Sequence, residues 1–128
     1  MKVIAVLIIM ILGGVNIGFS QTQVADTIVY DVVDNDAEFP KEYRNISYWL
    51  GENLEFINKP KKSESGRVIV KFCIEKDGSV TNISIRKGIS KNVDESVLKT
   101  ISKMPKWKPG FLNGKPVRSW FHLPISMD

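Results

Sequence analysis

Two side chains of types that act as nucleophile or base occur only once each, His122 and Cys73. A single histidine and a single cysteine cannot form a His/Cys zinc site with the usual spacing. A Ser-His-Asp triad would have to use His122, but the nearby Ser119 falls on the opposite face of an expected strand. No nucleophile motif G-x-S-x-G occurs, and no cysteine-protease signature surrounds Cys73. The sequence therefore predicts no enzyme, no metal site and no cofactor.

The charges of the chain are unevenly distributed along it. Residues 26–38 contain five acidic side chains and no basic one, whereas residues 96–127 contain six basic side chains and no acidic one. A basic end would attract an acidic peptide and speed its encounter, although a plain solvated surface is an equally open interpretation. The net charge of +4 is only moderately basic, which argues against nucleic acid as the partner.

Residues 1–20 are predicted to be a signal peptide or an N-terminal anchor. Lys2 precedes an apolar run from Val3 to Val15 that only two glycines interrupt. Gly18 and Ser20 fit the −3 and −1 positions of a cleavage site before Gln21. The apolar stretch also reaches the lower limit for a membrane-spanning helix. Both alternatives stay open, and both export the rest of the chain.

The rest of the chain is predicted to be one domain, residues 39–128, preceded by an acidic short linker or strand at residues 21–38. Residues 41–54 have the apolar spacing of a helix. The alternation over residues 66–86, interrupted by Asp77-Gly78, predicts an antiparallel hairpin. Residues 92–104 predict a second helix with Asn92 as its N-cap. Trp107, in the following loop, is expected to pack into the core.

Residues 117–125 predict the last strand. Pro124 lacks a backbone N–H, so this strand should lie at an edge of the sheet. The predicted order is a helix followed by β-β-α-β, which indicates an α+β fold with a small antiparallel three-stranded sheet packed by two helices.

Three runs of the sequence are similar to a known family when taken in order. They are GRVIVKFCIEKDGSVTNISIRKG (66–88), MPKWKPG (104–110) and NGKPV (113–117), and VYDVVDNDAEFP (29–40) lies upstream. Together they resemble the TonB C-terminal domain family, most closely its Bacteroidetes-type members. The resemblance implies the TonB C-terminal fold and a location in the periplasm, or in the inner membrane facing it if residues 1–20 are retained.

The resemblance also implies a partner and a site. Family members dock to outer-membrane TonB-dependent receptors, whose Ton-box segment pairs with the last strand; inner-membrane motor proteins are implied partners if the anchor is retained. An edge strand offers unpaired backbone groups to such a segment, and it also permits a homodimer. The predicted partner-binding residues are Val117, Arg118, Ser119, Trp120, Phe121, His122 and Leu123.

Two further hypotheses depend on the same strand. Residues 26–30 are themselves similar to a Ton box and could pair with the last strand in cis, so that deleting residues 21–36 would tighten receptor binding. Only about twenty residues separate the leader from the first helix, where related transducers have a long Pro-rich spacer. The alternative function is therefore a free-standing periplasmic scaffold or a cell-wall-binding module without energy coupling.

Overall fold

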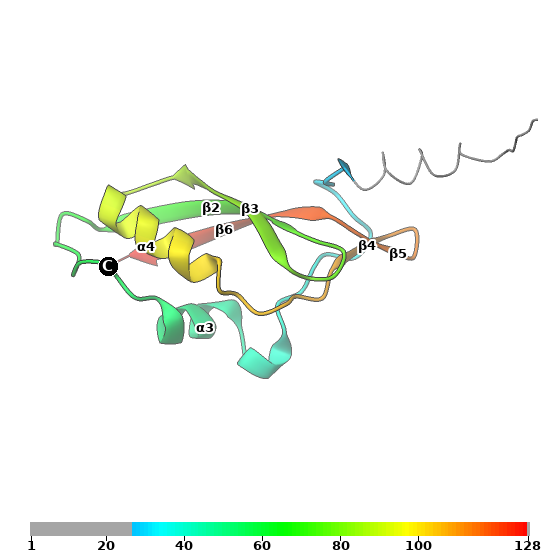
Figure 1. The fold of residues 1–128 in the computed structure, drawn as a ribbon, viewed down its shortest axis with the longest axis horizontal. Coiled ribbons are helices and arrows are strands. Elements are labelled where there is room, and N and C mark those ends of the chain that lie inside the picture. Colours follow the sequence, from blue (N-terminus) through cyan, green and yellow to red (C-terminus); the bar gives the residue numbers. More distant parts are fainter. Residues whose placement is uncertain (1–26, 128) are drawn as a thin grey trace, which may run out of the picture.

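The chain folds into a small sheet with two helices packed on it (Figure 1). The computed structural model describes residues 27–127, so the expected export segment lies outside it. Within those residues, no helix is long and apolar enough to cross a membrane. In chain order the elements are the 3-10 helix η1 (Lys41–Tyr43), α3 (Ile46–Asn53), β2 (Gly66–Ile74), β3 (Val80–Lys87), α4 (Lys91–Ile101), β4 (Gly110–Leu112), β5 (Lys115–Val117) and β6 (Ser119–Met127).

The main sheet has the strand order β3-β2-β6, and both pairings are antiparallel. The α+β fold predicted from the sequence is confirmed, with β6 at an edge of this sheet. A second sheet of two short strands, β4 and β5, closes around a turn at Asn113-Gly114. Asn113 and Gly114 both have positive φ, which suits them to that turn.

The predicted hairpin is confirmed as β2 and β3, and its turn also fixes a distant loop. Gly78 has φ +91°, and a Cβ on it would lie 2.0 Å from the backbone oxygen of Trp107. The Trp107 N–H donates to the Gly78 carbonyl at 2.9 Å. Only glycine allows this approach, because it combines the left-handed backbone with the absence of a side chain. The turn therefore holds Trp107 in the core, where 4% of it is exposed, as the sequence predicted.

Both helices differ in extent from the prediction. The chain breaks at Arg44, whose φ is +71°, so the predicted helix 41–54 divides into η1 and α3. Asn45 then caps α3 by accepting from the Tyr48 N–H. In α4 the prediction of Asn92 as N-cap was wrong, since the Ser90 hydroxyl accepts from the Val93 N–H.

The predicted last strand is found as β6, which begins at Ser119 and extends to Met127. Burial alternates along it, since Ser119, Leu123 and Ile125 are buried whereas His122, Pro124 and Ser126 are exposed. Val117, expected in the same strand, instead ends β5 and pairs with Gly110. The core contains buried residues of β2, β6, α3 and α4, so both helices cover the same face of the sheet.

Residues 28–38, which we call the N-terminal strap, lie against the C-terminal part of the chain. Where the sequence predicted a short linker or strand, the strap forms isolated bridges, the first of them a parallel bridge between Tyr30 and Ser119. Further antiparallel bridges join Asn35 to Phe111 and Glu38 to Lys108. The acidic segment of the chain thus pairs with part of its basic segment.

Candidate functional site

The outer edge of β6 is the side of that strand that faces away from β2. In an antiparallel pair, successive residues direct their backbone N–H and C=O alternately toward and away from the partner strand. The Trp120 N–H donates to the Tyr30 carbonyl at 3.0 Å, and the Tyr30 N–H donates to the Arg118 carbonyl at 2.9 Å. The even-numbered residues therefore point outward. The outer edge consists of the backbone groups of Arg118, Trp120, His122, Pro124 and Ser126.

The first half of this edge is already occupied. The two hydrogen bonds of Tyr30 use the Arg118 carbonyl and the Trp120 N–H. The Asp34 carboxylate accepts from the Asn113 N–H at 2.8 Å, which holds the strap against the β4–β5 turn. The pairing in cis hypothesised for residues 26–30 is thus found at Tyr30, while Asp26 lies outside the described residues. Its effect on receptor binding stays a prediction.

A partly buried ion pair stiffens the same half. The Arg118 Nε and Nη2 donate to the two carboxylate oxygens of Glu75 at 2.8 and 3.1 Å. Their side chains are only 18% and 23% exposed. The Thr81 hydroxyl also donates to Glu75. Burial raises the pKa of the Glu75 carboxyl, but the hydrogen bonds from Arg118 and Thr81 outweigh it and hold that pKa below its ordinary value.

Trp120 was predicted to be an exposed contact residue, and the structure places it in a half-buried position. The Lys71 ammonium lies 4.2 Å from the centre of its indole ring. Such a cation–π contact holds the ring against the sheet on the face that no helix covers. Its outward backbone N–H is occupied by Tyr30 as well. Trp120 therefore belongs to the occupied half of the edge.

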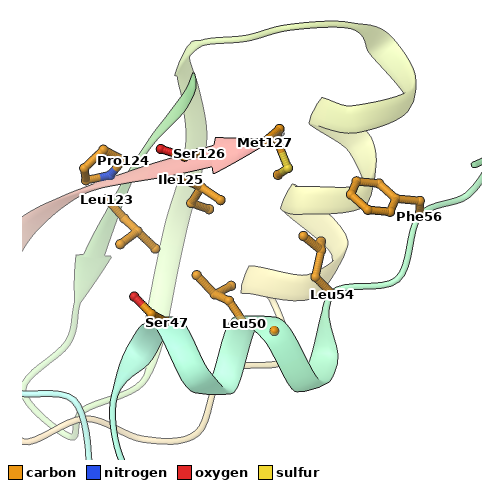
Figure 2. A pocket seen from close by; sticks show the side chains of 10 residues that line it. Ser47, Leu50, Leu54, Phe56, Leu123, Pro124, Ile125, Ser126 and Met127 are labelled. Atoms are coloured by element: carbon orange, nitrogen blue, oxygen red, sulfur yellow. The ribbon is translucent and has the colours of Figure 1, made fainter. Parts of the chain in front are cut away.

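The second half of the edge runs from His122 to Met127. Its residues 123–127 line a groove of about 500 Å³ that we call the α3–β6 groove. Figure 2 shows Leu50 of α3, and Leu54 just after its end, on the side of the groove opposite Leu123 and Ile125 of β6. Pro124 and Ser126 also line the groove, although their side chains point away from α3. The groove therefore follows the outer edge of the strand. Among residues 27–127, no backbone hydrogen bond from another segment reaches the outward groups of His122 or Ser126.

A second hollow of about 430 Å³ continues from the end of the groove. The two share Leu54, Phe56, Ser126 and Met127. The rim of this lysine hollow carries three lysines and one glutamate, a net charge of 3 − 1 = +2, from Lys59, Lys61, Lys62 and Glu64.

The structure places the seven predicted site residues in different environments. Val117 and Arg118 precede β6, and Ser119 and Leu123 are buried. Phe121 packs on Trp107 with ring centres 4.8 Å apart. His122 is exposed and has an outward-facing backbone. The sequence did not predict Ser126, Met127 or the α3 wall of the groove. A glycine inside a helical pattern, Gly51, was the one signal of a groove on α3.

Cys73 and His122 lie on the paired strands β2 and β6, where Cys73 is opposite Trp120 and His122 is opposite Lys71. Cys73 is fully buried, and burial together with the nearby Glu75 carboxylate raises the pKa of its thiol. It therefore stays protonated at neutral pH, and its burial argues against a disulfide link between chains. In the described part of the chain, no three His, Cys, Asp or Glu side chains gather in a way that could hold a metal ion.

The family model described as Gram-negative bacterial TonB protein C-terminal matches residues 59–127, which include β2 to β6 and leave out α3 and the strap. A search of curated proteins found no match.

Proposed function

The chain belongs to the family of Gram-negative bacterial TonB protein C-terminal domains, and from this premise we propose that it docks to outer-membrane TonB-dependent receptors. In the proposal, a Ton-box segment of the receptor adds as a strand to the outer edge of β6 and the interaction supports transport across the outer membrane. The single observation that carries the proposal is the unoccupied second half of that edge beside the α3–β6 groove.

In this proposal the unpaired edge and the adjacent groove contribute to binding in two different ways. Outward N–H and C=O groups of His122 and Ser126 pair with any extended backbone and give affinity with little demand on sequence. The groove receives alternate side chains of the added strand and provides selectivity. Pro124 offers a carbonyl but no N–H on this edge, so the added strand receives donors at residues 122 and 126 alone.

A proline scan of the edge tests this proposal. His122→Pro removes one outward donor but no bond to β2, and we expect about fivefold weaker binding of a Ton-box peptide in calorimetry. His122→Ala keeps the backbone donor and serves as the matched control, with binding close to that of the wild type. Equal binding by both variants would remove β6 from the site. Arg118→Glu is a poor test, because it would break the pair with Glu75.

A second copy of this chain is the competing occupant of the same edge. An edge-to-edge dimer would also protect the His122 amide, so the oligomeric state is measured by light scattering at the concentrations used for peptide binding. A monomer that binds peptide supports receptor docking. A dimer that the peptide fails to dissociate contradicts it.

We also propose that the domain works in the periplasm. Mass spectrometry of the mature protein distinguishes the two forms of this proposal. An N-terminus at Gln21 identifies a free periplasmic module without direct force transmission. Retention of residues 1–20 identifies an inner-membrane anchor facing the periplasm, which motor proteins could then engage.

A further inference from the structure

The α3–β6 groove has a wall that the family match does not include. Residues of α3 form one side of it, and α3 ends at Asn53, before the matched residues begin at position 59. The other side is β6, which lies within the match. The α3 side of the groove is therefore formed by residues that lie outside the family match.

Gly51 lies in the middle of α3 and lines this groove. A glycine inside a helix costs roughly 0.5–1 kcal/mol relative to alanine. A Cβ built on Gly51 meets no atom within 4 Å, and its φ is not in the left-handed region, so neither close packing nor backbone conformation requires glycine there. The absent side chain instead leaves the groove open beside Leu50 and Leu54.

The two ends of the open half differ in charge. At the His122 end, the strap places Asp31 and Asp36 around a small hollow that includes His122. At the Met127 end, the lysine hollow has a net positive rim. Its one carboxylate, Glu64, already accepts from the Ser90 hydroxyl and from the Lys61 N–H, whereas the three lysines are exposed. A bound segment therefore meets a negative end and a positive end.

We propose that this groove selects a receptor segment with apolar side chains in its middle and carboxylates at the end that lies beside Met127, and that Gly51 keeps the groove open for those apolar side chains. The inference rests on the proposed function, because it specifies the chemistry of the segment that adds to β6. Apolar side chains fill the space beside Leu50 and Leu54. The carboxylates pair with the lysines of residues 59–62. A segment bound in the opposite direction would place its carboxylates beside Asp31 and Asp36, where like charges repel.

Peptides of defined charge test the electrostatic part. The probes are Thr-Val-Thr-Ile-Thr-Glu-Glu and Glu-Glu-Thr-Val-Thr-Ile-Thr, each with capped ends and each compared with the same peptide carrying Lys for Glu. We expect one of the two acidic peptides to bind about tenfold more tightly than its lysine counterpart at low salt, with the preference shrinking as salt is added. The variant Lys59→Glu/Lys61→Glu/Lys62→Glu should reverse the preference.

Filling the groove tests the part played by Gly51. Gly51→Leu should weaken binding of the preferred peptide at least tenfold, because its side chain occupies the space beside Leu50 and Leu54. Glu52→Leu is the matched control, since it adds the same side chain to α3 at a residue that does not line the groove. Thermal unfolding of both variants verifies that each remains folded.

The outcomes separate this inference from the proposed function. If the wild type binds none of the four peptides and no Ton-box peptide either, docking on β6 itself fails. A second outcome is that a Ton-box peptide binds and His122→Pro weakens this binding, while Gly51→Leu and the triple lysine-to-glutamate variant leave binding unchanged. Docking on β6 then stands, and the inference about the groove is overturned.

Discussion

The two halves of the outer edge of β6 differ although they belong to one strand. The first half, at Arg118 and Trp120, is paired with Tyr30 and braced by Glu75. The second half, from His122 to Met127, has outward groups that no backbone of residues 27–127 pairs with, and it borders the α3–β6 groove. An exposed edge strand is a template for unwanted pairing, and covering part of it limits that risk. In the docking proposal, the receptor segment therefore adds to the second half.

The largest expected effect concerns the brace of the first half. Glu75→Ala leaves the Arg118 guanidinium partly buried without its carboxylate, and we expect a loss of about 2 kcal/mol in the free energy of unfolding. Glu95→Ala is the control, because Glu95 and Lys91 form an exposed pair at 3.9 Å that contributes little. Denaturant unfolding measures both. A loss no larger for Glu75→Ala than for Glu95→Ala would show that the brace is unimportant.

The same brace should respond to acid. The pKa of Glu75 is lower in the folded protein than its ordinary value, so its contribution is complete above the unfolded pKa of about 4.3 and is lost as the pH falls through the lowered pKa. The difference in unfolding free energy between the wild type and Glu75→Ala should be constant near neutral pH and shrink below about pH 4. A difference that grew on acidification would contradict this assignment.

Amide exchange compares the two halves directly. The Trp120 N–H, which donates to Tyr30, should exchange at least about tenfold more slowly than the outward His122 N–H. Deleting residues 21–31 removes Tyr30 but keeps the strap contacts from Asn35 onward, and it should bring the Trp120 rate close to that of His122. Adding a Ton-box peptide should then slow both amides in the deletion variant but only His122 in the intact chain. Equal exchange of the two amides in the intact chain would abolish the distinction between the halves.

The smallest expected effect concerns the open half. Gly51→Ala should stabilise the protein by about 0.5–1 kcal/mol, because alanine is the better helix former and its Cβ meets nothing within 4 Å. Thermal unfolding measures the gain. Destabilisation instead would mean that Gly51 has a packing role, which would remove the reason to connect it with binding.

Local patterns of the sequence predicted most of the sheet. Alternation in residues 68–74 placed one face of β2 in the core, and Pro124 predicted an edge strand, because both signals act over a few residues. The N-cap prediction failed, since Asn92 donates instead to the carbonyl of Asn58, which lies far away in sequence. The break at Arg44 was missed for a different reason, because a positive φ at a non-glycine residue leaves no clear signal in the sequence.

The candidate site was predictable only in part. The family resemblance predicted that the site lies on the last strand. The outward direction of the His122 backbone follows from the two-residue alternation of the strand, which also buries the Leu123 side chain. The α3 wall and the lysine hollow are formed by residues about seventy positions away from β6 along the chain. No pattern within a window of a few residues reports such a contact.

The sequence by itself determined the class of fold, the family, and the strand that offers an edge, since periodicity, turn residues and motifs are local properties of the chain. The tertiary structure decided which half of that edge is open. Hydrogen bonds from Tyr30 and the position of α3 depend on segments that meet only when the chain is folded. The charges divide in the same way. The acidic and basic segments are visible in the sequence, but only the folded structure shows that the two segments pair through their backbones and that the lysines of residues 59–62 lie beside the open half.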